Sequence, residues 1–342
     1  MMNRKKYMYV FICLLLSFNL LVAQDLHFSQ YFNAPLLVNP ANTGFNPDYD
    51  YRVGGNYRNQ WANVTSNPYK TMSLWGDAQL FNNQFENGWV GVGGTLYRDA
   101  AGIGSLTSTR GYATAAYHQM LGYSGLLSVG LGIGAINKRV DFSKLSFDNQ
   151  WNGRFFDVNI GSNEPFVYNS VTYIDFQAGV NYAWFVSDKA YLNVGVSMNH
   201  LNRPSESFFG KTSSVDQKVP IRYTTFLNGS FKIGDVWILN PNIYYSKMAD
   251  ASEMVVGMNA NRNLSGDGKQ QLILGFYYRS KDAMIPMIGL QTNNLRITAN
   301  YDVTSSALGS FNGRQGGYEI SIIKSGIYGG GNKFIKCPTV KF

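Results

Sequence analysis

Charged residues are scarce in this chain of 342 residues. Asp, Glu, Lys and Arg together make up 15% of it, and Phe, Trp and Tyr make up another 15%. A water-soluble surface beside so many aromatic side chains needs more charge than this. The composition therefore argues against an ordinary soluble domain. It is typical of a protein that places aromatic side chains at a lipid interface.

Long apolar runs are also missing after the first two dozen residues. The longest run spans residues 7–22 and lies between the basic residues Arg4, Lys5 and Lys6 and the small residue Ala23. This order is typical of a secretory signal peptide, so we predict cleavage after Ala23. An uncleaved anchor is the alternative, but the run is slightly short for one. No later run approaches the roughly 18 apolar residues of a transmembrane helix.

Clustered positive charge is a third absence. The predicted signal peptide carries three of the 29 basic residues and none of the 21 acidic ones, which leaves a formal charge of +5. Proteins that bind nucleic acid need clustered Lys and Arg, so we predict no nucleic-acid partner. A mild excess spread along the chain suits contact with acidic lipid headgroups or with an acidic partner.

Cysteine and histidine are nearly absent. Of the two cysteines, Cys13 lies in the predicted signal peptide, and Cys337 is left without an intramolecular partner. The histidines His27, His118 and His200 have no metal-ligand spacing to one another or to Cys337. We therefore predict no metal, no cofactor and no enzymatic activity.

Alternation of apolar and polar residues with a period of two is what the sequence has in abundance. It is present in residues 127–135, 174–182, 192–199 and 295–302. A soluble β-sandwich alternates too, but many of these segments reach about ten residues, the length that crosses a bilayer as a tilted strand. The sequence therefore predicts an all-β fold, a transmembrane antiparallel β-barrel of about fourteen strands with long external loops.

The connections between the strands support this prediction. The long ones, 138–172, 201–219 and 304–315, follow odd-numbered strands, whereas short turns such as 187–189 follow even-numbered ones, as expected for external loops and periplasmic turns. Two connections fit less well, 262–269 and 280–282, so the count carries an error of about two. Pro241 and Pro286 weaken two strands because proline cannot donate a ladder hydrogen bond. We place the strands at residues 50–59, 70–81, 88–98, 106–119, 125–137, 173–185, 190–200, 220–233, 236–246, 252–261, 270–279, 283–292, 295–303 and 316–324.

The parity of the alternation predicts which side chains face the lumen. Apolar positions should face lipid, so the polar positions between them should point inward. The predicted lumen-facing residues are Asp175, Gln177, Asn181, Arg222, Arg296 and Glu319.

The glycines of residues 130–134 look at first like a nucleotide-binding motif. They lie within a strand with no following helix, so close packing against the wall is the better interpretation.

Four parts of the chain follow from these patterns. Residues 1–23 are the signal peptide, residues 50–324 the barrel and residues 325–342 a periplasmic tail. Residues 24–49 contain three prolines around an apolar Leu36-Leu37-Val38 run, which is too apolar to stay solvated. We therefore predict that this segment docks at the periplasmic mouth or inside the lumen.

Several motifs together resemble one known family. Residues 24–31 read QDLHFSQY, residues 39–44 read NPANTG, and residues 57–61 read YRNQW. With residues 318–322 and 335–338 near the end, they resemble the PorP/SprF family, outer-membrane proteins of the Bacteroidota type IX secretion and gliding machinery. The resemblance covers nearly the whole chain. It implies an integral outer-membrane location and partners among periplasmic ring or peptidoglycan-associated subunits, with a secreted surface adhesin as cargo.

The candidate partner-binding residues come from these motifs and from one loop. They are Phe28, Ser29, Gln30, Tyr31, Asn39, Pro40, Tyr57, Arg58, Trp61, Trp151, Phe155 and Phe156. We also predict that loops 138–172 and 201–219 form the external surface that binds cargo.

Three functions remain open. The first is a non-enzymatic secretion scaffold or anchor, the second is a channel for small solutes, and the third and weakest is a secreted β-rich adhesin. A filled lumen would favour the scaffold over the channel.

Overall fold

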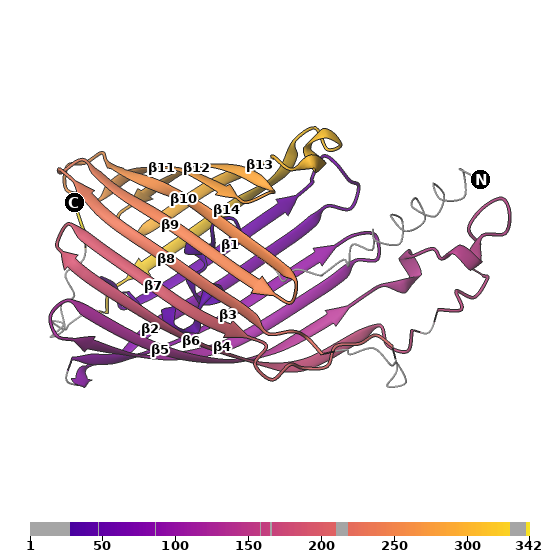
Figure 1. The fold of residues 1–342 in the computed structure, drawn as a ribbon, viewed down its shortest axis with the longest axis horizontal. Coiled ribbons are helices and arrows are strands. Elements are labelled where there is room, and N and C mark those ends of the chain that lie inside the picture. The colour runs from indigo at the N-terminus through magenta and orange to yellow at the C-terminus, as the bar shows by residue number, and fades with distance from the viewer. Residues whose placement is uncertain are drawn as a thin grey trace, which may run out of the picture.

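The alternating segments form fourteen antiparallel strands that close into a barrel (Figure 1). The computed structural model describes residues 28–46, 48–85, 87–157, 159–164, 166–209, 218–328 and 340–342. Each described strand pairs with its neighbours in chain order, and β14 pairs with β1, so the ring is complete. A closed ring satisfies the backbone hydrogen bonds between strands, as lipid requires. The predicted antiparallel barrel is confirmed, and so is the number of strands.

The strand bounds follow the alternation closely, and most lie within two or three residues of those predicted. The strands are β1 (Tyr51–Gln60), β2 (Tyr69–Phe85), β3 (Gly88–Ala101), β4 (Leu106–Leu121), β5 (Gly125–Arg139), β6 (Ser170–Ser187), β7 (Ala190–Asn199), β8 (Arg222–Ile233), β9 (Trp237–Met248), β10 (Ala251–Asn263), β11 (Gln270–Arg279), β12 (Ala283–Thr292), β13 (Leu295–Thr304) and β14 (Gln315–Gly326).

Helical structure is confined to short turns. Three lie before the barrel, η1 (Tyr31–Asn33), α2 (Pro35–Val38) and η2 (Pro40–Asn42). Three others lie in loops, η3 (Phe142–Lys144), η4 (Asp148–Gln150) and η5 (Ala307–Ser310). Over the described ranges, no helix has the length and apolar character needed to span a membrane. The predicted signal peptide lies outside the described residues, as do His27 and both cysteines.

The two faces of the wall differ in chemistry as the alternation predicts. In β6, Asp175 and Asn181 are completely buried, whereas Ile174 is 50% and Val180 46% exposed. An exposed apolar face on a closed sheet is what a lipid bilayer accommodates. A sandwich would instead bury its apolar face between two sheets.

The two prolines within strands are accommodated without a change of register. Pro241 pairs with β10, and the ladder from β9 to β8 lacks the pairs at Gly229 and Ser230. Pro286 pairs with β11, while the ladder from β12 to β13 is interrupted beside it. Each proline therefore has an interrupted ladder on one side, where a backbone N–H is not needed.

The two ends of the barrel carry different connections. We call the end with the connections after odd-numbered strands the long-loop mouth, and the other end the short-turn mouth. The loop 140–169 projects from the long-loop mouth in Figure 1. Outer-membrane barrels place their short turns in the periplasm. The two connections that fit the predicted parity less well are residues 264–269 and 280–282 in the structure. Each joins two directly paired strands, β10 to β11 and β11 to β12.

Candidate functional site in the lumen and at the long-loop mouth

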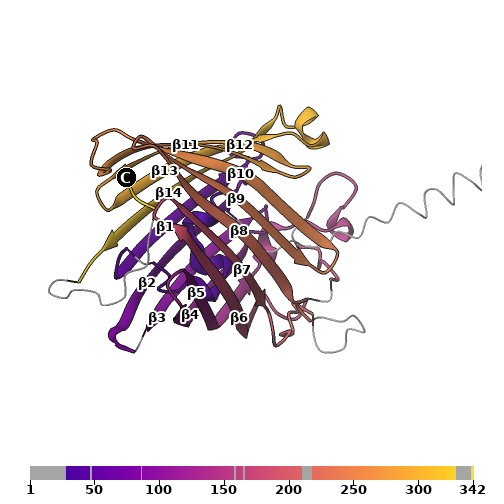
Figure 2. The same cartoon turned by 60° about the vertical axis from the view of Figure 1, so that its left-hand side comes forward.

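The segment 28–46 runs through the lumen from one mouth to the other, inside the wall in Figure 2. We call this segment the plug. Its first residues contact Asp302 and Glu319, which lie in the halves of β13 and β14 nearer the long-loop mouth. Its last residues contact Asp77 and Trp89, nearer the short-turn mouth. Of the two docking places predicted, the lumen is the one observed for residues 28–46.

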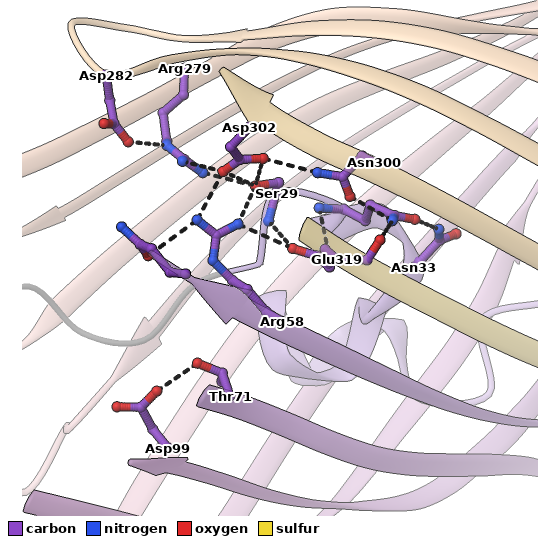
Figure 3. Close-up of polar contacts among 12 residues, drawn as sticks. Ser29, Asn33, Arg58, Thr71, Asp99, Arg279, Asp282, Asn300, Asp302 and Glu319 are labelled. Atoms are coloured by element: carbon purple, nitrogen blue, oxygen red, sulfur yellow. Dashed lines mark hydrogen bonds and ion pairs between the residues drawn. The ribbon is translucent and has the colours of Figure 1, made fainter. Parts of the chain in front are cut away.

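A buried charge network holds the start of the plug (Figure 3). Arg58 of β1 contacts Asp302 at 2.8 Å and Glu319 at 3.4 Å, and Arg279 of β11 contacts Asp302 at 2.5 Å. All four side chains are almost completely buried. Buried ions are tolerated only when paired and hydrogen-bonded. Two guanidinium groups facing two carboxylates meet that condition.

The plug backbone completes this network. The N–H groups of Ser29 and Gln30 donate to the two carboxylate oxygens of Glu319, at 2.8 and 2.9 Å. The Ser29 hydroxyl donates to Asp302 at 2.9 Å and accepts from both arginines. The Gln30 amide donates to Asn300 at 2.6 Å. Hydrogen bonds to charged groups are about twice as strong as neutral ones, so this end of the plug is firmly fixed.

Glycines in the wall let the middle of the plug approach closely. A Cβ built on Gly130 would overlap the backbone of Pro40, and one built on Gly179 would overlap the Asn39 side chain. Asn39 fills the space left there, donating to the Val180 carbonyl at 3.1 Å. Gly130 belongs to the glycine run 130–134, so its role is close packing and not nucleotide binding.

The last part of the plug is fixed near the short-turn mouth. The Nε2 atom of His118 lies 2.8 Å from the Thr43 carbonyl, and its Nδ1 atom lies 2.7 Å from the Ser128 hydroxyl. A neutral imidazole protonated at Nε2 satisfies both contacts. The Trp89 indole N–H donates to the Gly44 carbonyl at 3.0 Å. His118 thus clamps the plug, and this geometry needs no catalytic role.

The six residues predicted to face the lumen are placed on the inner face or against its cavities. Asp175 contacts the Nδ1 atom of His200 at 3.0 Å and accepts from the Tyr112 hydroxyl at 2.6 Å. Asn181 donates to Asn42 of the plug at 3.0 Å. The other four are Glu319 in the charge network, Gln177 packed over Gly132, Arg222 bonded to the Tyr244 hydroxyl at 2.8 Å, and Arg296 lining a cavity beside the plug.

The candidate partner-binding residues divide into three groups. Those of the plug are buried, so they offer no exposed surface while the plug is seated, and Arg58 is buried with them. Tyr57 lies on the outer face beside Tyr318, and Trp61 contacts Tyr69 at the long-loop mouth. The third group, Trp151, Phe155 and Phe156, lies in loop 140–169. The plug members are Phe28, Ser29, Gln30, Tyr31, Asn39 and Pro40.

Aromatic rings join the two longest loops at the long-loop mouth. Phe166 of loop 140–169 stacks on Phe142 at 4.1 Å and on Phe209 of the loop 200–221 at 5.2 Å. The Val167 N–H donates to the Phe208 carbonyl at 3.0 Å. On the same loop Trp151, Phe155 and Phe156 are each about half exposed. Exposed aromatic groups of this kind commonly mark protein-binding surfaces.

Sequence patterns did not identify every residue of the site. Asp302 and Arg279 were not singled out, although Asp302 lies at an inward position of an alternating strand. Its partners lie far away in sequence, on β1 and β11. His118 was considered only as a possible metal ligand or catalytic residue, not as a contact of the plug. Among the residues that the structure describes, no group of three or more His, Cys, Asp or Glu side chains is placed to hold a metal ion.

Comparison with known proteins agrees with this architecture. Residues 21–323 match the family described as type IX secretion system membrane protein PorP/SprF. No curated protein matches this chain. Among solved structures, the CymD monoaromatic hydrocarbon channel gives a TM-score of 0.50 at 10% identity, over 86% of this chain and 93% of that one. At this identity the likeness shows the fold alone.

Two further solved structures give lower scores. The toluene transporter TbuX of Ralstonia pickettii gives a TM-score of 0.47 at 11% identity, over 86% of this chain and 93% of that one. The translocator domain of the autotransporter NalP from Neisseria meningitidis gives 0.45 at 11% identity, over 88% and 96%.

Proposed function

Because this chain belongs to the PorP/SprF family of type IX secretion system membrane proteins, we propose that it is a non-enzymatic outer-membrane component of that system. In this proposal it assists export, or anchors at the cell surface, a secreted adhesin-like protein. It reaches the outer membrane after cleavage of its signal peptide. Its short-turn mouth contacts periplasmic ring or peptidoglycan-associated subunits.

The plugged lumen is the observation that carries the proposal. A solute channel needs a passage, whereas this lumen holds residues 28–46, fixed at both ends. Hydrogen bonds to charged groups contribute about 1.5–3 kcal/mol each, and Glu319 accepts two of them from the plug backbone. A barrel filled in this way works through its two mouths, and the exposed side chains of Trp151, Phe155 and Phe156 lie at the long-loop mouth.

The aromatic group of loop 140–169 is the proposed cargo surface. Its test is the triple variant Trp151→Ser, Phe155→Ser, Phe156→Ser, because serine removes the apolar surface of each ring and adds no charge. Cargo retention on the cell surface, measured by quantitative labelling of intact cells, should fall about tenfold or more, since a few buried aromatic anchors dominate most interfaces. The matched control is Phe311→Ser, because the Phe311 ring is more exposed and lies in another loop of the same mouth.

Retention that stays at the wild-type level in the triple variant would contradict the proposed cargo surface. The channel alternative is tested separately with the purified full chain in planar bilayers. We expect conductance near zero, whereas a steady open conductance would favour the channel and refute the scaffold.

A further inference from the structure

A cavity of about 350 Å³ lies between the plug and the inner wall, toward the short-turn mouth. On the plug side it is lined by Tyr31, Phe32 and Val38, and on the wall side by β6 to β10. Its volume is that of a small-molecule site. The proposed cargo surface lies at the other mouth, so this cavity needs a separate explanation.

The wall of this cavity carries a row of asparagine amides. Asn193 of β7 lies directly opposite Asn228 of β8, and Asn228 lies directly opposite Asn242 of β9. Neighbouring strands are about 4.8 Å apart, so the three amides form a row across the strands. Each amide offers both donors and an acceptor. The row therefore matches a ligand with polar groups repeated along its length.

Two acceptors in this row have no partner among the described residues. The Oδ1 atoms of Asn193 and Asn228 are buried and accept no hydrogen bond from that part of the chain, and Asn193 is 6% exposed. By contrast, Asn242 donates to the Tyr277 hydroxyl at 3.0 Å. A buried polar group without a partner is costly, so unpaired acceptors in a cavity point to a ligand with hydroxyl or N–H donors.

The charges around the cavity exclude a strongly ionic ligand. Arg52 is paired with Asp77, and Asp48 with Lys341. Arg296 donates to Gln291 at 2.8 Å, which leaves one guanidinium among neutral groups. A polyphosphate would need several cations. An extended peptide commonly binds by adding to a sheet edge, and the described wall is a closed ring with no such edge.

Aromatic side chains form another part of the cavity surface. Phe185 and Tyr191 lie together with their ring centroids 5.4 Å apart, and Phe226 also lines the cavity, farther along the wall. A sugar presents hydroxyl groups on its edges and apolar C–H groups on its faces, so amides and rings together suit it. We propose that this cavity binds a neutral oligosaccharide whose hydroxyl or acetamido groups donate to Asn193 and Asn228.

Titration calorimetry on the detergent-solubilised full chain tests this site. The probes are triacetylchitotriose and maltotriose, and we expect at least one to bind. Asn193→Leu keeps the side-chain size but removes the amide, so it should weaken binding about tenfold. Asn228→Leu provides a second test of the same row. The matched control is Asn199→Leu, on the same strand, whose unpartnered Oδ1 atom faces the small cavity toward the long-loop mouth.

Three outcomes would overturn the proposal. The first is that neither trisaccharide binds the wild-type chain. The second is that Asn199→Leu weakens binding as much as Asn193→Leu and Asn228→Leu do. The third is that a pentapeptide with the sequence of residues 338–342 binds and the sugars do not, since Val340 lies at this cavity. A tenfold loss in the two row variants alone, with Asn199→Leu unchanged, would support it, whatever the outcome for cargo binding.

Discussion

Glu319 fixes the start of the plug, and its replacement by alanine tests how firmly. The change removes the acceptor of the Ser29 and Gln30 N–H groups, at 2.8 and 2.9 Å, and takes one carboxylate from Arg58. Two hydrogen bonds to a charged group contribute about 3–6 kcal/mol together. Removing one partner of a buried ion pair costs about 3–5 kcal/mol, which lies within that range.

Hydrogen–deuterium exchange measures this loss directly at the plug. Because about 1.4 kcal/mol corresponds to a factor of ten, exchange of the amides of residues 28–34 should become roughly a hundred- to ten-thousand-fold faster in Glu319→Ala. The experiment uses the full chain in detergent, with mass spectrometry of peptides that cover the plug. Heat modifiability on SDS gels, which is the difference in mobility between heated and unheated samples, reports separately that the barrel wall remains folded.

Glu206→Ala is the matched control. Glu206 is also paired with a cation, Lys138 at 2.6 Å, but both side chains lie at the long-loop mouth and are 22–24% exposed. A surface ion pair contributes about 0–1 kcal/mol, so this variant should leave exchange in the plug unchanged. If plug exchange in Glu319→Ala stays within threefold of the wild type, or if the control accelerates it equally, the anchoring role assigned to Glu319 is wrong.

Three further predictions concern the middle of the plug, one turn and the N-terminus. Gly179→Val should displace Asn39 and the plug around it, because the new side chain overlaps it, and a steady conductance in planar bilayers should then appear. Hydrogen bonds from Lys269 hold the pKa of Asp267 below its usual range. The ordered conformation of turn 264–269 should therefore persist below the ordinary aspartate pKa and be lost as the pH falls through the lowered pKa. Hydrogen–deuterium exchange of the backbone amides of this turn measures the effect, and Asp267→Asn should abolish its dependence on pH. Intact-mass measurement of the outer-membrane protein should give a chain that begins at Gln24, and a mass that includes residues 1–23 would contradict signal cleavage.

The wall of the barrel could be predicted from the sequence because its signal is local. A period of two within one strand indicates both the strand and its two faces, as at Ile174 and Asp175. Turn residues then separate one strand from the next. Even Pro241 and Pro286 did not mislead the assignment, since one proline beside an interrupted ladder leaves the pattern of the strand intact.

The interior of the barrel could not be predicted in the same way, because its contacts are not local. Ser29 and Glu319 are 290 residues apart, and no pattern within either segment identifies the other. One signal was available in part. Gly130 and Gly179, both at inward positions, lie directly opposite each other once the strands are aligned, and such a stripe marks a place where another segment approaches the wall.

The charge network also bears on how the ring becomes complete. Arg58 lies on the first strand and Glu319 on the last, directly opposite each other across the seam where the two ends of the sheet meet. Ser29 bonds to both of these side chains from inside. During assembly, sealing of the seam and seating of the N-terminal segment are therefore expected to be one event. A ring that sealed with an empty interior would leave the carboxylates of Glu319 and Asp302 without their backbone and hydroxyl donors from this segment.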